Sequence, residues 1–179
     1  IWCKVKIKDI AKVGRGRVIS QNEIFKAINN KYPVYSSQTT NNGIMGYIDT
    51  FDFNGEYITW TTDGEKAGTV FYRNGEFNCT NVCGTIKLKE GNARFIHYIL
   101  ANEAPKYVSR NLANPKLMNE PMKNIEIIIP KDISEQGLIS DLIQTIEAEI
   151  FIIESKFQKL KHQKMGMMQA LLTGKTRLI

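Results

Sequence analysis

The sequence predicts an α+β protein, in which a domain with a mixed, largely antiparallel sheet is followed by one long C-terminal coiled-coil helix. Short β-rich runs separated by turn residues occupy residues 1–131. A single helical pattern then continues from about Ser134 to Leu172. A chain of 179 residues has room for one domain of ordinary size and this helix. We therefore divide the chain into a domain at 1–131 and a helical segment at 132–179.

Apolar residues recur along the C-terminal segment at alternating spacings of four and three. The mean spacing of about 3.5 residues is the period of a coiled-coil seam. At ~1.5 Å per residue the seam is roughly 50 Å long, so the helix needs a partner helix to cover it. A long helix folded back on its own domain remains the alternative. The same spacing continues through Lys164, the one polar residue of the series, to Met167 and Leu171. The seam positions that we assign to the dimer are Ile139, Ile143, Ile146, Ile150, Ile153, Phe157 and Leu160.

Both ends of the helix carry recognisable signals. Asp132 followed by Glu135 fits an N-terminal capping arrangement. Gly174, with Lys175 beside it, fits a C-terminal stop. The pattern predicts one uninterrupted helix between these points.

Alternation of apolar and polar residues predicts short strands in the first 131 residues. The Asn74-Gly75 pair between two β-rich runs, 69–73 and 76–80, predicts a type I′ hairpin. Apolar spacing near residues 92–102 predicts a short helix. The expected strands are Lys4–Lys8, Pro33–Ser36, Tyr57–Trp60, Gly84–Leu88 and Ile125–Ile129.

The net charge of +6 lies entirely at the C-terminal end. Residues 155–179 contain no acid, whereas basic and acidic residues balance over 1–154. Overall charge is therefore weak evidence that the domain binds nucleic acid. The sequence shows no membrane-spanning run and no signal peptide at its start, which favours the cytoplasm.

The residues that usually carry enzyme chemistry are sparse. The two histidines, His97 and His162, have no spacing typical of a metal pair or a catalytic dyad. Three cysteines without a CxxC pair indicate neither a disulfide framework nor a zinc site. We predict no catalytic residue, no metal and no cofactor in this chain.

Three loops instead gather side chains that contact phosphates and base edges in DNA. These loops cover 37–43, which follows the expected strand at 33–36, 61–68 and 106–116. A glycine-rich basic run at 14–17, expected to be flexible, adds two arginines suited to phosphate. Ordinary surface loops share this composition, so the alternative of solvated loops stays open. The candidate DNA-binding residues are Arg15, Arg17, Ser36, Gln38, Thr39, Asn41, Thr61, Thr62, Lys66, Arg110, Asn111 and Lys116.

Several motifs together resemble Type I restriction-modification specificity subunits. The runs 57–64 and 67–70, followed by Cys83-Gly84, resemble the target recognition domain of that family. The runs 5–11 and 124–130 resemble the start of such a domain and its last strand. The run 168–178 is similar to the end of the conserved helix of the family. The resemblance covers essentially the whole chain.

The resemblance implies a non-catalytic subunit that reads double-stranded DNA. In that family, two recognition domains are held apart by two conserved helices in an antiparallel coiled coil, and each domain reads half of a bipartite site. Separate modification (methyltransferase) and restriction subunits dock onto this scaffold, and the modification subunit binds S-adenosylmethionine.

This chain contains only half of that content, with one recognition domain at 1–131 and one helix at 132–179. It is therefore expected either to form a homodimer through the helix or to be a fragment of a longer subunit. An assembly protein that binds protein partners without reading DNA is the competing interpretation.

Overall fold

The computed structural model describes residues 1–110 and 114–178. It contains two compact units, one at 1–137 and one at 138–179. The first turn of the long helix therefore belongs to the first unit. The antiparallel sheets and the long helix confirm the predicted α+β class.

The centre of the first unit is an antiparallel four-stranded sheet in the order β2-β9-β6-β7. The expected strands at 57–60 and 84–88 are confirmed within it. Trp60 is fully buried and faces Gly84 on the neighbouring strand. A Cβ atom on Gly84 would lie 2.3 Å from the Trp60 ring, so only glycine leaves room for this indole. The strands are β2 (Ala11–Arg15), β6 (Tyr57–Thr61), β7 (Val70–Arg73) and β9 (Cys83–Leu88).

A second four-stranded sheet has the order β4-β3-β8-β5. Its β3 and β8 strands run parallel, while the other neighbours are antiparallel, so this sheet is mixed. Phe77 is buried at its centre, with the ring of Phe53 stacked on it and the ring of Tyr35 tilted against it. The strands are β3 (Tyr32–Tyr35), β4 (Ile44–Ile48), β5 (Phe53–Asn54) and β8 (Glu76–Cys79).

The predicted hairpin at Asn74-Gly75 is wrong. Strand β7 pairs with β6 in the first sheet, whereas β8 pairs with β3 and β5 in the second. A type I′ turn needs positive φ at both central residues, and only Gly75 has it, at 102°. Burial of Phe77 in the second sheet outweighs the local turn preference, so this pair of residues carries the chain from one sheet to the other.

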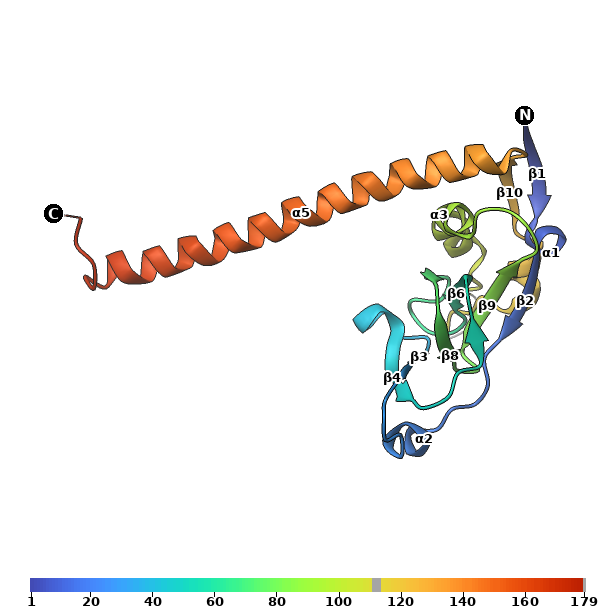
Figure 1. Cartoon of the computed structure of the whole chain (residues 1–179), viewed down its shortest axis with the longest axis horizontal. Coiled ribbons are helices and arrows are strands. Elements are labelled where there is room, and N and C mark those ends of the chain that lie inside the picture. The colour runs from blue at the N-terminus through green and yellow to red at the C-terminus, as the bar shows by residue number, and fades with distance from the viewer. Residues whose placement is uncertain (111–113, 179) are drawn as a thin grey trace. The chain divides into compact units, whose positions relative to one another are not determined.

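The two ends of the first unit meet in a separate two-stranded sheet. Strand β1 (Trp2–Lys6) pairs antiparallel with β10 (Glu126–Pro130), side by side in Figure 1. The strand expected at 4–8 ends at Lys6, because the chain turns into the short helix α1 (Ile7–Ile10) and buries Ile7 completely.

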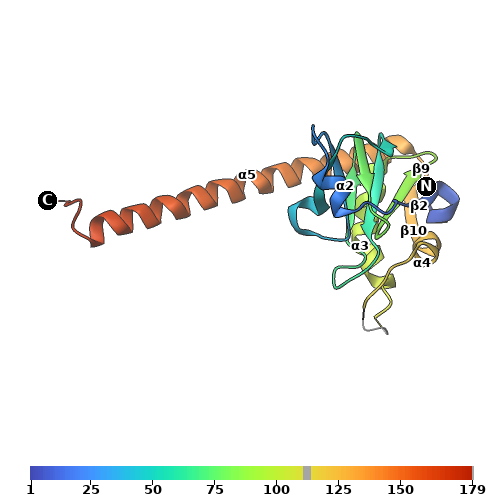
Figure 2. The ribbon, with the colours of Figure 1, turned by 90° about the horizontal axis from the view of Figure 1, so that it is seen from below.

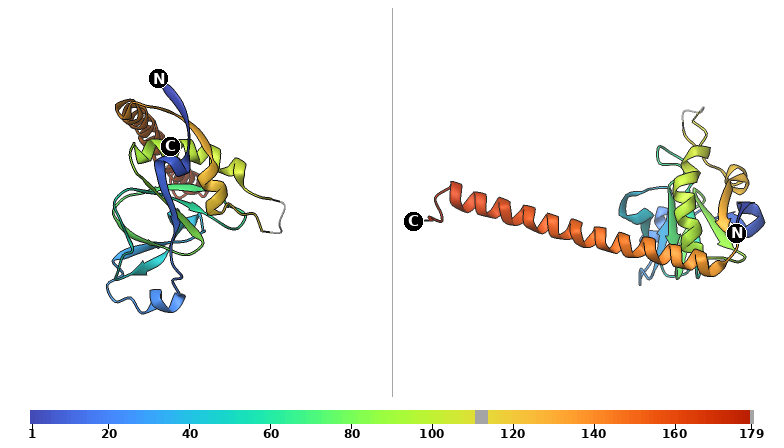
Figure 3. Two further views of the ribbon diagram at one scale, coloured as in Figure 1. Left: turned by 90° about the vertical axis from the view of Figure 1, so that its right-hand side faces the viewer. Right: turned by 90° about the horizontal axis from the view of Figure 1, so that it is seen from above.

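Two short helices, α3 (Ala93–Glu103) and α4 (Asn119–Asn124), contact strands of the first sheet. The expected helix near 92–102 is confirmed as α3, which Asn92 caps by accepting a 2.8 Å hydrogen bond from the Phe95 amide. Phe95, Ile96 and Leu100 form its buried face, and Figure 3 shows α3 lying along the sheet. Helix α4 leads into β10, as Figure 2 shows. The remaining short helices are α2 (Gln21–Phe25), η1 (Thr40–Gly43) and η2 (Ala104–Tyr107).

The long helix α5 (Ile133–Leu172) has the predicted length and ends. Its cap forms where the Asp132 carboxylate accepts a 2.9 Å hydrogen bond from the Ser134 amide. Glu135 accepts a 3.1 Å bond from the Trp2 indole. Gly174, with φ of 71°, follows the last turn, as a helix stop requires. Within 1–110 and 114–178, no helix is long and apolar enough to cross a membrane.

Candidate functional site

Two of the predicted loops, 61–68 and 106–116, lie against each other. The Gly64 amide donates to the Pro115 carbonyl at 3.0 Å, and the Leu117 amide donates to the Thr62 carbonyl at 2.9 Å. The Lys116 ammonium lies 3.5 Å from the Asp63 carboxylate. These contacts combine segments distant in sequence into one polar surface, which we call the paired-loop surface (residues 61–68, 104–110 and 114–116).

Thr61 and Thr62 support this surface from inside. Their exposed fractions are 1% and 0%. The Thr61 hydroxyl donates to the Lys66 carbonyl, and the Thr62 hydroxyl lies within 2.9 Å of the Val82 carbonyl. Burial leaves these two hydroxyls no surface for a base or a phosphate, so the geometry gives them a supporting position.

Cations lie at the exterior of the paired-loop surface. Lys66 and Arg110 are exposed, and Lys116 is half-buried through its ion pair with Asp63. The tight packing of Gly68 against Val108 and Pro105 holds the two loops together near these cations. Asn111, the remaining candidate here, lies outside the described residues.

The glycine-rich basic run at 14–17 is not a flexible loop, so that expectation is wrong. Gly14 and Arg15 belong to β2. A Cβ atom on Gly16 would lie 1.9 Å from the Cys79 carbonyl oxygen, and the Arg17 amide donates to that oxygen at 3.1 Å. The glycines allow close backbone packing here, and this packing fixes both arginines.

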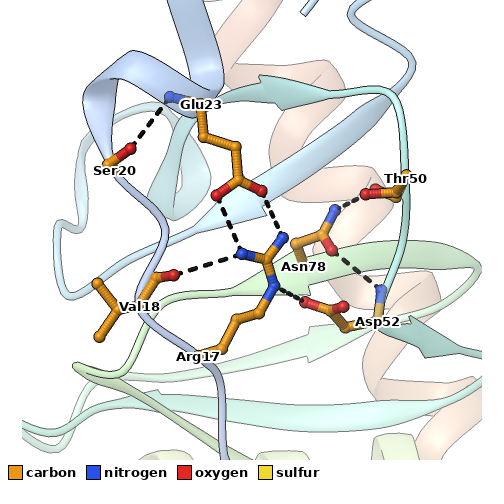
Figure 4. Close-up of polar contacts among 7 residues, drawn as sticks. All are labelled: Arg17, Val18, Ser20, Glu23, Thr50, Asp52 and Asn78. Atoms are coloured by element: carbon orange, nitrogen blue, oxygen red, sulfur yellow. Dashed lines mark hydrogen bonds and ion pairs between the residues drawn. The ribbon is translucent and has the colours of Figure 1, made fainter.

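Arg17 is held between two carboxylates (Figure 4). Its Nε donates to Asp52 at 2.9 Å, and its Nη1 donates to Glu23 at 3.0 Å. The hydrogen bond to Glu23 raises the pKa of the guanidinium, and the same bond lowers the pKa of Glu23. Asn78 supports the site by accepting from the Asp52 amide at 3.0 Å and donating to the Thr50 carbonyl at 2.7 Å. With its charge matched by two acids, Arg17 fastens α2 to the second sheet.

Arg15 is also engaged within the domain. Its Nε donates to the Asn119 side chain at 3.0 Å, and its Nη2 contacts the Met118 sulfur at 3.1 Å. The side chain is half-buried. It joins β2 to the start of α4.

The polar run at 36–43 forms a tight loop that contains η1. Gln38, a candidate base reader, instead donates its side-chain amide to the Ile44 carbonyl. Ser36 and Thr39 are half-buried, and Asn41 is exposed. The loop therefore has an internal support, Gln38, and an outward-facing tip.

Two residues of this site, Arg73 and Asn42, are not among the candidates predicted from the sequence. Arg73 is 4% exposed on β7, and its Nη2 donates to the Asn42 carbonyl at 2.7 Å. Asn42 is exposed beside Asn41, and both have positive φ. The sequence signal for Asn42 was its place in the same polar run. Arg73 carried no such signal, because an arginine at the end of a strand is usually a surface residue.

The seam of α5 is exposed over its central turns. Exposed fractions are 49% for Ile146, 50% for Ile150 and 66% for Ile153, and Phe157 and Leu160 are similarly open. Ile139 and Ile143 are half-buried. A row of large apolar side chains in water is the usual mark of an interaction surface.

The described part of the chain contains no group of three or more His, Cys, Asp or Glu residues placed to hold a metal ion. Cys79 and Cys83 are buried, with their sulfur atoms 3.5 Å apart. Burial raises the pKa of the Cys79 thiol well above its usual value, which makes it a poor nucleophile.

Comparison with known proteins identifies one family. A model of the Type I restriction modification DNA specificity domain matches residues 1–162. A putative type I specificity subunit N-terminus of Mycoplasma pneumoniae is 51% identical over 124 residues, which is 68% of this chain and 66% of that protein. The type I restriction enzyme MpnII specificity subunit of the same organism is 42% identical over 157 residues, 81% of this chain and 47% of that protein.

A solved structure agrees with these relatives in fold. The S subunit of a Type I restriction-modification system from M. genitalium superposes with a TM-score of 0.72 at 17% identity, over 87% of this chain and 41% of that one. The present chain therefore spans roughly half or less of some of these subunits. The match over residues 1–162 shows that the chain belongs to the Type I restriction modification DNA specificity family.

Proposed function

We propose that this chain is the sequence-reading part of a Type I restriction-modification complex, without catalytic activity of its own. It would direct separate methyltransferase and endonuclease subunits to a bipartite DNA target. The match to the specificity family over residues 1–162 is the observation that carries this proposal. That match also favours DNA reading over the competing assembly role, because the relatives of this chain are named specificity subunits.

The DNA contacts are proposed at two places on the domain. Lys66 and Arg110 on the paired-loop surface are exposed cations suited to phosphates or guanine edges. Ser36, Thr39 and Asn41 supply polar groups on the loop at 36–43. The contacts that Arg15, Arg17, Gln38, Thr61 and Thr62 make within the domain support a structural role rather than direct contact with DNA. Lys116 forms an ion pair with Asp63 and remains partly exposed to solvent.

A homodimer through α5 is the second part of the proposal. The exposed apolar seam of α5 would be buried against a partner helix, and α5 of a second copy has a seam of the same spacing. The charges along the helix also favour pairing with a reversed copy. Residues 138–154 carry four acids and no base, whereas 155–164 carry four lysines and no acid. An antiparallel pair brings the acidic half of each helix beside the basic half of the other, while a parallel pair opposes like charges.

The dimer geometry makes a prediction about the target. A seam of roughly 50 Å corresponds to about 15 base pairs at ~3.4 Å each, so a spacer should separate the two half-sites. Two-fold symmetry places two identical domains on DNA, so the target should be an inverted repeat.

The remaining partners follow from the same assignment. The modification subunit would dock on the scaffold and bind S-adenosylmethionine, and the restriction subunit would join through it. We propose no cofactor on this chain and a location in the cytoplasm.

Selection from a randomised duplex pool tests the proposal. The chain is used alone and together with the methyltransferase subunit, and bound duplexes are sequenced. We expect an enriched inverted repeat with an unread spacer. The absence of any enriched sequence under both conditions would contradict DNA reading and favour the assembly role.

A further inference from the structure

The loop at 38–43 has an unusual backbone. Asn41, Asn42 and Gly43 are consecutive residues with φ of 49°, 51° and 80°. Asparagine adopts the left-handed region more readily than other residues with a Cβ atom, but normally as a single residue, so a run of three left-handed residues still has a conformational cost that the surroundings must offset. The loop therefore needs a specific support from the rest of the domain.

Arg73 supplies that support. Its Nη2 donates to the Asn42 carbonyl at 2.7 Å, and its Nε donates to the Thr59 hydroxyl at 3.3 Å. A Cβ atom on Gly43 would lie 3.0 Å from the same Nη2 atom, so the loop closes directly over the guanidinium. One arginine thus connects the loop to two neighbouring strands, β6 and β7.

The environment of Arg73 is costly for a cation. The side chain is 4% exposed, and its guanidinium carbon lies 3.6 Å from the centroid of the Tyr35 ring and 4.5 Å from that of Phe71. In the described ranges no carboxylate forms an ion pair with it, and burial lowers its pKa. The two aromatic faces offset part of the desolvation cost. A buried guanidinium without an acid is best explained by the loop that it holds.

The tip that Arg73 supports is suited to DNA bases. Asn41 and Asn42 are exposed, and an asparagine amide can bond to adenine through a donor and an acceptor together. The surrounding sequence favours an anionic partner, because residues 24–48 contain no acid and carry Lys26 and Lys31. Asn42 was absent from the candidates that the sequence suggested.

We propose that Arg73 is a positioning residue for sequence recognition, which fixes the left-handed loop so that Asn41 and Asn42 present their amides to base edges. The proposal rests on the DNA-reading function proposed above. It assigns base reading to the loop tip and the holding of that tip to one guanidinium.

Variants at Arg73 separate its geometry from its charge. Arg73→Lys keeps the charge but cannot bond to Thr59 and Asn42 with one planar group, and Arg73→Met removes the charge at similar volume. Arg94→Met is the matched control. Arg94 lies over Tyr72, which neighbours Arg73 on β7 and points to the opposite face of the strand.

Variants at the tip test the reading directly. Asn41→Gly and Asn42→Gly remove the amides while glycine accepts the left-handed backbone without strain. Loss of a bidentate contact should reduce discrimination at one base pair by roughly 5- to 150-fold.

All variants are compared in the duplex selection described above, with thermal melting and amide hydrogen exchange of residues 40–44 measured in parallel. We expect Arg73→Lys and Arg73→Met to lose base preference at the same positions of the half-site as the glycine variants. Base preference at the other positions and the melting temperature should be largely kept. Exchange in the loop should accelerate in both arginine variants and stay unchanged in Arg94→Met.

Three results would overturn the proposal. Identical full sites for wild type and both arginine variants would show that the guanidinium does not set recognition. If Arg73→Lys selected the wild-type site and Arg73→Met lost base preference, the charge of residue 73, and not its geometry, would set recognition. If the glycine variants selected the wild-type site, the side-chain amides of Asn41 and Asn42 would have no role in recognition. A wild-type protein that selects no sequence would instead contradict the proposed function itself.

Discussion

The indole Nε1 of Trp60 donates a 2.8 Å hydrogen bond to the carbonyl of Leu117, and both residues are fully buried. This bond joins strand β6 to the segment that follows the paired-loop surface. It therefore connects the centre of the first sheet to the region where the proposed phosphate contacts lie.

Replacing Trp60 with Phe should destabilise the domain by about 1–3 kcal/mol, since the buried carbonyl loses its donor. A cavity beside Gly84 adds to this cost. Urea unfolding followed by circular dichroism measures the change. A variant as stable as the wild type would show that the bond contributes nothing to the fold.

Gly84→Ala and Gly166→Ala should change stability in opposite directions. A Cβ atom on Gly84 meets the Trp60 ring at 2.3 Å, so the larger residue forces the indole to move and costs roughly 1–3 kcal/mol. Gly166 lies in α5 with nothing within 4 Å, so alanine should stabilise the helix by up to ~1 kcal/mol. Thermal melting of both variants provides the comparison, and equal effects would contradict the packing argument.

The ion pair between Arg17 and Glu23 predicts a pH dependence of stability. The hydrogen bond from Arg17 lowers the pKa of Glu23 below the usual value of a glutamate side chain. The contribution of the ion pair to the free energy of unfolding is therefore complete above the pKa of Glu23 in the unfolded chain. It is lost as the pH falls through the lower pKa of Glu23 in the folded protein. Glu23→Gln should lack this component, and its melting temperature should fall less than that of the wild type between about pH 5 and 3. Both side chains are partly exposed, so high salt should reduce the difference. Parallel pH profiles for the two proteins would argue against the ion pair.

Polar substitution of the α5 seam should produce monomers. Glutamine at Ile146, Ile150 and Ile153 removes three apolar side chains that we expect to be buried between two copies. Ile152→Gln is the control, since Ile152 is 64% exposed and lies off the seam. Sedimentation equilibrium measures the mass. A dimer that persists in the triple variant would reject the proposed helix pairing.

Cations of the paired-loop surface should act on affinity. Lys66→Ala should weaken binding to all duplexes alike and reduce the salt slope of log K by about 1 if the lysine contacts a phosphate. Arg110→Ala should instead relax selection at one position if the arginine reads guanine. Titrations at several salt concentrations against the selected and a scrambled duplex distinguish these effects. Unchanged affinity in both variants would remove this surface from the interface.

The long helix was predictable because its pattern is local. Heptad spacing, a capping aspartate and a terminal glycine specify α5 without reference to the rest of the chain. Strands β6 and β9 were equally clear, since their side chains alternate within a few residues. The resemblance to specificity subunits also rested on short runs of sequence, and the family match confirmed it.

The predicted hairpin was wrong for the opposite reason. The turn preference of Asn74-Gly75 is local, but the partner of each flanking strand is chosen by burial across the domain. Phe77 gains more from the second sheet than the hairpin could offer.

The candidate site shows the same division. Composition identified the polar loops but could not separate exposed from bonded side chains. Arg17 became part of an ion-pair network because α2 and the turn before β5 bring Glu23 and Asp52 to it. Thr61 and Thr62 became internal supports because the paired loops close over them.

The sequence by itself determined the helix, its seam and the family, since each depends on residues close together in the chain. Only the tertiary structure decided which polar side chains face solvent and which hold the loops. Arg73 demonstrates the reason. Its place at the end of β7 says nothing of Asn42, because the hydrogen bond between them joins residues 31 positions apart.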